Sequence, residues 1–407
     1  MSGSFTNPGQ WSELPLGAVS AVWPTLEFRS FVQVQIICGA QSNQSLLEKI
    51  CNAWCDRKIP LLVPDHCRGD FDSSKLSPSS NAIIGFVTSG STSLATSIVW
   101  KSWSALNSEA LVLSQVFGVC KVSTVVSLVP AIHIYGFLYG VLLPCVSGAK
   151  LISGGRWDFP FFAPTGLNIE ADLVVSVPPL WSCLEVLLEE FRSAVFVSSG
   201  AAFGRRRAEA AARMRRDICA SFQIVDVVGS TETGGIGWRQ VVGDKVEECF
   251  SLFDGVSLLP PKIEGAAWHV RSPFTDDLVL EVSDLFNMSG DGTKFNYAGR
   301  SDRVVKIGAK RIDLGDIEAA MSHCADGKFA VCIFLESPDS AKGGTLHVFI
   351  ETGTDSADGD SSALMRSYQK YSTHLPIPTG IQFVSQLPRG PMGKISRLSL
   401  EGLLAGP

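Results

Sequence analysis

The feature that most constrains the fold is an alternation, over about the first 240 residues, of short apolar runs and longer segments with helical spacing. The apolar runs are rich in β-branched residues and bounded by turn residues, which is typical of strands. The segments between them carry apolar residues three and four positions apart, which predicts helices. Strands that alternate with helices predict a mostly parallel sheet covered on both faces, and so an α/β fold.

The expected strands are SFVQVQIICG, IPLLVP, AIIGFVTSG, VSTVVSLVP, ADLVVSVP, SAVFVSSG and QIVDVVGSTE. The expected helices are SLLEKICNAWCDR, WKSWSALNSEALVLSQVFG, SCLEVLLEEF and RAEAAARMRRDICASF. In parallel sheets, ligands bind beyond the carboxyl ends of the strands. Functional residues are therefore expected in the loops that follow strands.

The segment from Val122 to Ala149 contains no Lys, Arg, Asp or Glu, and this is long enough to suggest a membrane-spanning helix. Prolines and glycines nevertheless interrupt it repeatedly, among them Pro130, Gly136 and Pro144. That punctuation favours a buried strand, a turn and a buried helix. We therefore expect no membrane span.

The pattern changes after about residue 240, where AAWHVRSP, LVLEVSDLF and KFNYAGR alternate like antiparallel strands joined by tight turns. A second change comes at Gly299-Arg300-Ser301-Asp302. Beyond it, a helix, two strands and a final helix predict a compact α+β unit. The expected architecture is a large N-terminal domain of mostly parallel sheets with a small β subdomain, followed by a small α+β domain.

Composition excludes some functions and favours a globular protein. The net charge of −6 gives no reason to expect nucleic acid or an anionic membrane as a partner. The basic cluster around Arg205-Arg206-Arg207 is typical of a solvated helix face. The eleven cysteines include no C-x-x-C pair, and the polar, Gly/Pro/Ser-rich start does not resemble a secretory signal. We expect reduced thiols and a cytoplasmic location.

Four loops that follow expected strands offer small residues and backbone donors at the predicted ligand edge. They are TSGSTS from residue 88, PAIHIYG from 130, SSGAAFG from 198 and VVGSTETGG from 227. Any one of them alone is most simply a turn. The last places a hydroxyl, Thr231, beside a carboxylate, Glu232, which suits an Mg²⁺ ion carried by phosphate groups.

In their order and spacing, these loops resemble the motifs of the adenylate-forming superfamily of acyl-CoA synthetases, peptide-synthetase adenylation domains and luciferases. TSGST resembles its phosphate loop, PAIHIYG its acyl-pocket loop, SSGAA its adenine turn and GSTETGG its Mg²⁺/phosphate motif. VSDLF…GRSDRVVKIGAKRIDLGDIEAAM resembles its ribose-binding and hinge segment, and LPRGPMGKISR the segment with its catalytic lysine. The resemblance covers roughly residues 80 to 400.

The resemblance implies that ATP and Mg²⁺ are bound and assigns residues to them. Thr231 would contact the α-phosphate, Glu232 would bind the metal and Asp284 would bind both ribose hydroxyls with Arg300 nearby, although an ion pair of Asp284 and Arg300 is the plain alternative. The remaining nucleotide-binding positions are Thr88, Ser89, Gly90, Ser91, Thr92, Ser199, Gly200, Ala201, Gly229 and Ser230.

The resemblance also implies an acid pocket and a moving C-terminal domain. Lys394 would bridge the substrate carboxylate and the α-phosphate, although without its surroundings it would be an ordinary loop lysine. Asp302 would be the hinge, which gives an adenylation core over residues 1–299, a hinge over 300–303 and a mobile domain over 304–407. The pocket residues would be His133, which could equally be a packed core histidine, with Tyr135, Gly136, Trp181, Gly234 and Gly235.

The implied function is ATP-dependent activation of a carboxylic acid to an acyl-adenylate, followed by transfer to a thiol. Within the superfamily, the sequence is most similar to the compact ligases that supply aryl acids to aryl-polyene, xanthomonadin and flexirubin-type pathways. That similarity implies an aryl acid, such as a hydroxybenzoate or cinnamate, and the phosphopantetheine thiol of an acyl carrier protein as acceptor. An acid–CoA ligase and a catalytically silent binding protein are the alternatives.

The sequence departs from the family pattern in the second half of the phosphate loop. Ser93, Ala95, Thr96 and Ser97 stand where the family usually has Gly, Pro, Lys and Gly. Lys101 lies five residues beyond the missing lysine, on the expected helix, and would replace it only if its side chain folded back. We expect a weaker grip on pyrophosphate and retained chemistry.

Overall fold

The computed structural model describes the chain outside residues 1–10, 15, 29–30, 32, 39–42, 65–70, 72–74, 90–95, 122, 155–168, 178–190, 193–194, 200–222, 243–244, 247–248, 264–265, 308–309, 327, 338–343, 354–358, 389–394, 396 and 406–407. The chain divides into two compact units. The first comprises Met1–Val282 and Met288–Asn296, and the second contains Ser283–Asn287 and Tyr297–Gly390 together with the last helix. The hinge over residues 300–303 stays a prediction.

The largest sheet of the described chain has eleven strands in the order β1-β7-β6-β9-β11-β12-β13-β15-β20-β19, with β14 paired to β13. The run from β7 to β12 is parallel, and the pairs from β12 through β13 and β15 to β20 are antiparallel. The strands are β1 (Trp11–Leu14), β6 (Thr124–Ser127), β7 (Lys150–Gly154), β9 (Leu173–Ser176), β11 (Val195–Ser199), β12 (Gln223–Ser230), β13 (Gly234–Val242), β14 (Lys245–Val246), β15 (Phe250–Leu252), β19 (Asp284–Met288) and β20 (Lys294–Arg300).

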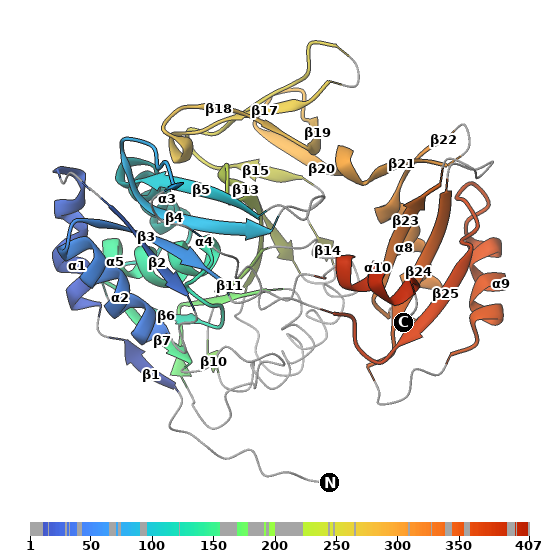
Figure 1. Cartoon of the computed structure of the whole chain (residues 1–407), viewed down its shortest axis with the longest axis horizontal. Helices are drawn as coiled ribbons and strands as arrows, with labels where there is room; N and C mark the ends of the chain where they lie inside the picture. The colour runs from blue at the N-terminus through green and yellow to red at the C-terminus, as the bar shows by residue number, and fades with distance from the viewer. Residues whose placement is uncertain are drawn as a thin grey trace, which may run out of the picture. The chain divides into compact units, whose positions relative to one another are not determined.

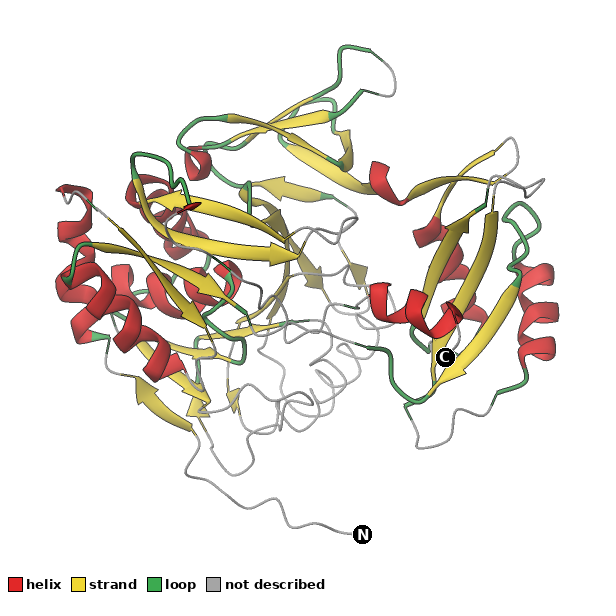
Figure 2. Cartoon of the chain, viewed as in Figure 1, coloured by secondary structure: helices red, strands yellow, loops and turns green. Residues whose placement is uncertain are grey.

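A second sheet of the first unit has the order β2-β3-β4-β5, in which β2, β3 and β4 are parallel and β5 is antiparallel to β4 (Figure 1). Its strands are β2 (Gln33–Cys38), β3 (Lys58–Val63), β4 (Ala82–Ser89) and β5 (Thr96–Ser102). The helices beside it are α1 (Gly17–Val22), the short 3₁₀ helix η2 (Trp23–Phe28), α2 (Asn43–Cys55) and α3 (Trp103–Val116). Figure 2 shows how the helices gather around the strands of this unit.

The α/β prediction is confirmed, and one predicted element is wrong. The expected helix WKSWSALNSEALVLSQVFG begins at Trp103 and not before, because Thr96–Ser102 forms β5. The cap explains the boundary: Ser102 has extended backbone, and its Oγ accepts a hydrogen bond from the backbone N–H of Ala105 at 3.0 Å. The helices expected in 178–190 and 200–222 lie outside the described residues.

The segment without charged residues is built as predicted, from a buried strand, a turn and a buried helical run. β6 is followed by α4 (Ile134–Phe137), the π-helical turn η5 (Leu138–Leu142) and α5 (Leu143–Ser147). The helical run ends at Gly148, whose φ of 74° is the left-handed conformation that favours glycine. Among the helices that the structure describes, none has the length and apolar character needed to cross a lipid bilayer.

The predicted antiparallel region is also confirmed. A three-stranded sheet has the order β16-β17-β18, formed by β16 (Ser257–Leu259), β17 (Trp268–Arg271) and β18 (Val279–Val282). The 3₁₀ turn η7 (Pro273–Thr275) connects β17 to β18. A separate parallel pair joins β8 (Ile169–Glu170) to β10 (Phe191–Arg192).

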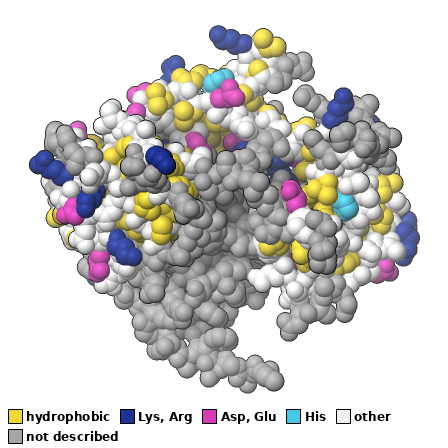
Figure 3. Space-filling view, viewed as in Figure 1, with side chains coloured by type: hydrophobic (Ala, Val, Ile, Leu, Met, Phe, Trp, Pro, Cys, Tyr) yellow, Lys and Arg dark blue, Asp and Glu magenta, His cyan; other side chains and the backbone are white. Residues whose placement is uncertain are grey.

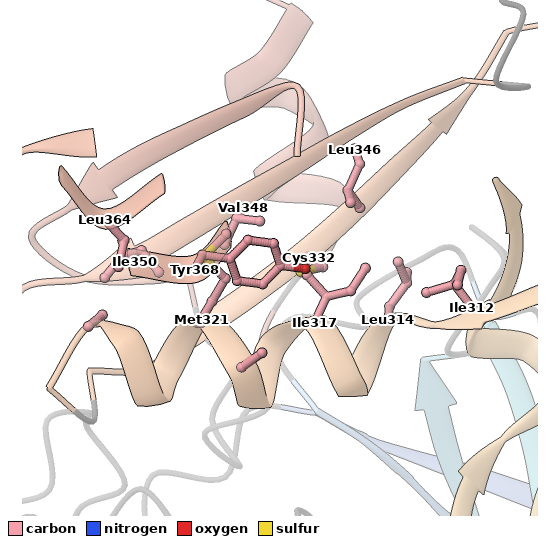
Figure 4. Close-up of a cluster of buried hydrophobic side chains, with 13 residues drawn as sticks. Ile312, Leu314, Ile317, Met321, Cys332, Leu346, Val348, Ile350, Leu364 and Tyr368 are labelled. Atoms are coloured by element: carbon pink, nitrogen blue, oxygen red, sulfur yellow. The ribbon is translucent and has the colours of Figure 1, made fainter. Parts of the chain in front are cut away.

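The second unit is an α+β fold with its own core. Its central sheet has the order β23-β24-β25, and its apolar cluster lies between that sheet and two helices (Figure 4). Met321 and Ile317 of α8 point towards Cys332 of β23 and Val348 of β24. Tyr368 of α9 packs against the same cluster. The elements are η8 (Ser301–Arg303), β21 (Val304–Ile307), β22 (Lys310–Asp313), α8 (Leu314–Cys324), β23 (Ala330–Glu336), β24 (Gly344–Glu351), α9 (Ser361–Tyr371), β25 (Gly380–Val384) and α10 (Arg397–Ala405).

Candidate functional site

Four neighbouring parallel strands of the large sheet each end in a serine. Ser127 ends β6, Ser176 ends β9, Ser199 ends β11 and Ser230 ends β12. Because these strands are parallel and adjacent, their carboxyl ends meet at one edge of the sheet, where α/β folds bind ligands. The hydroxyl of Ser199 donates to the carbonyl oxygen of Val227 at 3.0 Å and so ties β11 to β12 at this edge.

Tyr135 lies at the start of α4 and connects two of these strand ends. Its hydroxyl oxygen is 3.0 Å from the carbonyl oxygen of Ser176 and 3.1 Å from that of Val197, so its one proton is shared between β9 and β11. Burial raises the pKa of Tyr135 well above its ordinary value, and the phenol stays neutral. The ring of Tyr139 lies 4.8 Å from that of Tyr135, centroid to centroid. Tyr135 therefore ties the ends of β9 and β11 together at this edge of the sheet.

His133 and Gly136 shape the turn before α4. The half-buried His133 has extended backbone at the N-terminus of α4. Its backbone N–H donates to the carbonyl oxygen of Pro130 at 3.3 Å. Gly136 lies so close to the same carbonyl group that a Cβ atom there would overlap it. Only glycine fits at position 136, because backbone cannot yield as a side-chain end can.

The residues of the predicted metal motif form the hairpin turn between β12 and β13. Ser230 and Thr233 are joined by three contacts. Thr233 N–H donates to Ser230 Oγ at 3.1 Å, Ser230 N–H donates to Thr233 Oγ1 at 3.2 Å, and the two hydroxyl oxygens are 3.1 Å apart. Thr233 is fully buried, whereas Glu232 is exposed and Thr231 half-buried. A β-bulge between Val228 and Gly229 shifts the register just before the turn. The turn is fixed from within, and it presents the carboxylate of Glu232 to solvent.

Lys101 lies beneath this turn and not in the phosphate loop. It is on β5, only 3% exposed, and its Nζ donates to the backbone carbonyl oxygens of Glu232 at 3.0 Å and Phe274 at 3.1 Å. The hypothesis that Lys101 replaces the missing phosphate-loop lysine is therefore wrong, since the side chain points to these carbonyl groups instead.

Glu109 is the functional candidate that sequence reasoning missed. It lies on α3, 2% exposed, and its Oε1 accepts a hydrogen bond from the backbone N–H of Gly235 at 2.6 Å. Its Oε2 is buried and has no hydrogen-bond partner among the described residues. Burial raises the pKa of Glu109 to about 7, while the Lys101 ammonium and the Gly235 N–H oppose that rise. The available signal was a lone carboxylate beside Ala105, Leu106, Ala110 and Leu113 on the apolar face of the helix.

Asp284 and Arg300 lie together in the second unit, as the sequence predicts. Arg300 Nη1 is 3.5 Å from Asp284 Oδ1, and the hydroxyl of Tyr297 donates to the same oxygen at 2.9 Å. The Asp284 side chain is 14% exposed. Burial, and then the Asp284 charge, raise the pKa of Tyr297, so the phenol remains the donor. These contacts form an ion pair; a role in ribose binding stays a prediction.

Several predicted site residues lie outside the described residues. The structure places Thr88 on β4, where its Oγ1 is 2.7 Å from Ser97 Oγ on β5. For Ser89 and Asp302 only the backbone is described, in β4 and η8. The positions not described are Gly90, Ser91, Thr92, Trp181, Gly200, Ala201 and Lys394.

The surface is not strongly basic where it is visible. On the face drawn in Figure 3, the Lys and Arg side chains of the described residues are dispersed, and several of them lie beside Asp or Glu side chains. Among the described residues, no group of three or more His, Cys, Asp and Glu side chains is arranged to hold a metal ion.

A parallel sheet with hydroxyl groups along its carboxyl edge, and a hairpin that presents one carboxylate there, are typical of an α/β enzyme that binds a ligand at this edge. A sequence model of the AMP-binding enzyme family matches residues 29–252. This match covers more than half of the chain, and the protein belongs to that family. The predicted family is confirmed.

Relatives and solved structures agree with this assignment. A 4-coumarate–CoA ligase from Halorhodospira halophila is 29% identical over 72% of this chain and 70% of its own length. A second one, from Cereibacter sphaeroides, is 27% identical over 76% of this chain and 69% of its own length.

Two solved structures show the same fold. ATP-bound MatB from Rhodopseudomonas palustris has a TM-score of 0.69 at 16% identity, covering 96% of this chain and 92% of its own. The anthranilate CoA ligase AuaEII, in complex with anthranoyl-AMP, has a TM-score of 0.68 at 14% identity, covering 96% and 90%.

Proposed function

We propose that this protein activates a carboxylic acid with ATP as an acyl-adenylate and transfers the acyl group to a thiol. The observation that carries the proposal is the family match over residues 29–252, within which the rigid hairpin turn presents Glu232 at the carboxyl edge of the sheet. That edge is where a nucleotide is expected in such a sheet.

The chemistry explains why an acid of this kind is activated through a nucleotide. A carboxylate is a poor electrophile, so its oxygen first attacks the α-phosphorus of ATP, the bond to the bridging oxygen breaks, and pyrophosphate leaves. The thiol sulfur then attacks the acyl carbonyl carbon, and AMP leaves with the electron pair of the broken C–O bond. Both steps bring anions together, so cationic groups at the transition state lower their barriers.

The Ser230–Gly235 turn and the Asp284–Arg300 pair are proposed to bind ATP. Thr231 contacts the α-phosphate, Glu232 binds Mg²⁺, and Asp284 with Arg300 binds the ribose. The exposed carboxylate beside a half-buried hydroxyl fits a metal that arrives with phosphate groups. When bound, Mg²⁺ neutralises part of the phosphate charge. Lys394 is proposed to bridge the substrate carboxylate and the α-phosphate.

We propose an aryl acid as the substrate, such as a hydroxybenzoate or a cinnamate. Tyr135, Gly136, Gly234 and Gly235 are proposed to line the acid pocket, and the aromatic ring of Tyr135 suits a flat substrate. The missing side chains of the three glycines also make room for the Pro130 carbonyl group, Glu109 and Phe253. The names of the curated relatives support this choice, since 4-coumarate is a hydroxycinnamate.

The proposed acceptor is the phosphopantetheine thiol of an acyl carrier protein in the cytoplasm. CoA, which carries the same thiol, is the second candidate, because the two curated relatives are named as CoA ligases. Incubation of the protein with ATP, an aryl acid and either CoA or a holo carrier protein distinguishes the two. Efficient turnover with CoA alone would remove the carrier protein from the proposal.

The adenylation step is tested by acid-dependent exchange of labelled pyrophosphate into ATP. A panel of hydroxybenzoates, aminobenzoates, cinnamates and fatty acids identifies the substrate class. We expect exchange with at least one aryl acid and little with fatty acids. The absence of exchange with every acid, together with no effect of Lys394→Ala, would instead indicate a catalytically silent binding protein.

A further inference from the structure

Two ionisable side chains, a lysine and a glutamate, are buried beneath the turn that carries Glu232, and the proposed reaction assigns neither of them a role. Lys101 on β5 is 3% exposed and Glu109 on α3 is 2% exposed. Each contacts the backbone of the turn, and each does so at a different point. Lys101 holds the carbonyl oxygen of Glu232, and Glu109 holds the N–H of Gly235.

The contacts around Lys101 join three segments that are distant in the sequence. Its Nζ donates to Glu232 and to Phe274, which lies in η7. The next residue, Ser102, donates to Asp276 Oδ1 at 2.5 Å, at the end of the same 3₁₀ turn. The start of α3, η7 and the metal-motif turn are thus fixed to one another through adjacent residues of β5.

Glu109 closes the other side of the turn. Its Oε1 is 2.6 Å from the Gly235 nitrogen, and its Oε2 lies where a Cβ atom on Gly234 would come within 2.7 Å of it. Gly234 has a φ of +71°, so both the backbone conformation and the contact with Glu109 require glycine. Lys101 and Glu109 therefore constrain the backbone from Glu232 to Gly235, in addition to the contacts within the turn.

Stability of the fold alone does not explain why the ionisable side chains of Lys101 and Glu109 are buried here. Taking an ammonium or a carboxylate out of water is costly, and apolar side chains of similar size commonly do as well in a core. The Lys101 ammonium holds the backbone carbonyl group of Glu232 and so fixes the backbone that carries the Glu232 carboxylate. An apolar side chain could not donate this hydrogen bond.

We propose that Lys101 and Glu109 are positioning residues that clamp the Ser230–Gly235 turn from beneath and so fix the Glu232 carboxylate for the metal that accompanies ATP. This inference rests on the proposed function and deepens it. Groups behind a metal ligand orient it, and their loss typically reduces metal affinity or activity by roughly 10- to 100-fold.

The test compares the two half-reactions in Lys101→Met. The first is pyrophosphate exchange, which needs the triphosphate and its metal; the second is thioester formation from a supplied acyl-adenylate, which needs neither. We expect exchange to fall by roughly 10- to 100-fold and to require more Mg²⁺, with thioester formation changed much less. Lys58→Met, the same change at a more exposed position of the same sheet, is the control and is expected to behave like the wild type.

Equal losses in the two half-reactions, or an unchanged Mg²⁺ requirement in a folded Lys101→Met protein, would overturn the clamp. If Lys101→Met does not fold, Glu109→Ala is measured in the same assays with the same criterion. Glu109→Gln keeps an oxygen to accept the Gly235 N–H, so it should lose less exchange than Glu109→Ala. Equal losses in these two variants would also contradict the clamp.

A binding measurement separates failure of the clamp from failure of the proposed function. The dissociation constant of Mg²⁺–ATP, measured by calorimetry, should rise in Lys101→Met and stay constant in Lys58→Met. A wild-type protein that binds Mg²⁺–ATP without catalysing exchange would contradict the proposed function. The dissociation constants of Lys101→Met and Lys58→Met would then still test the clamp. A wild-type protein that does neither would overturn both.

Discussion

At the scale of single residues, the exposed Glu232 and the buried Glu109 show how one carboxyl group differs from another by its surroundings. Glu232 sits on the tip of a hairpin in contact with water, where a negative charge costs little. Glu109 is buried between α3 and the turn, near Tyr139. Its pKa rises to about 7 because burial disfavours the charged form. The first suits a metal ligand, and the second suits a fixed structural acceptor.

Removal of the Glu232 carboxylate should reduce adenylation by roughly 10²-fold or more, since it deletes one electrostatic stabiliser of the transition state. Pyrophosphate exchange by Glu232→Ala, at saturating acid, measures this loss. The folded state should be unaffected, because the side chain is exposed. An exchange rate equal to that of the wild type would show that the metal motif has been assigned to the wrong residues.

Glu109 should make the protein less stable as the pH rises from about 5 to about 7. Its pKa is raised from 4.5 to about 7 in the folded state, so in this interval the folded protein binds more protons than the unfolded chain, and stability falls with rising pH. The full effect is on the order of 3 kcal/mol. Urea unfolding of the wild type and of Glu109→Gln across this range should show a slope that the variant lacks; parallel curves would contradict a buried, protonated Glu109.

At the scale of elements, the sequence predicts strands and helices well where the local pattern of side chains determines them. It fails where pairing with a distant strand determines whether a segment is a strand or a helix. Ile98, Val99 and Trp100 favour a strand by their side chains, yet they run into α3 without a glycine or proline to mark the boundary. Only pairing with β4 settles that they form β5. Lys101 illustrates the same limit, since its partner Glu232 is 131 positions away in the sequence.

Ser102 defines the boundary between β5 and α3, so its removal should weaken that junction. Ser102→Ala loses the N-cap bond from Ala105 and the bond to Asp276. The N-cap alone contributes about 1 kcal/mol, and we expect the free energy of unfolding to fall by at least that amount. Ser104→Ala, an exposed position on the same helix, is the matched control. Equal stability of the two variants in urea would show that the cap does not set the boundary.

At the scale of the whole molecule, the two compact units account for which parts of the site could be predicted. The strands that precede the four motif loops are confirmed as β4, β6, β11 and β12, and Asp284 and Arg300 lie together, because each is local in sequence or spans a single hairpin. The clamp beneath the turn could not be predicted, because it depends on three segments of the first unit that meet only in the folded protein.

The predicted hinge gives the molecule-scale test. The backbone of Ser301–Arg303 forms the short helix η8, which lies in the second unit a few residues after the chain enters it at Tyr297. Proline at position 302 fixes φ and removes an N–H, which restricts rotation about this point. If the second unit must turn between the half-reactions, Asp302→Pro should preserve pyrophosphate exchange and abolish thioester formation. Asp302→Ala, which keeps backbone freedom, should retain both steps, and equal loss of both steps in the proline variant would contradict a hinge at this residue.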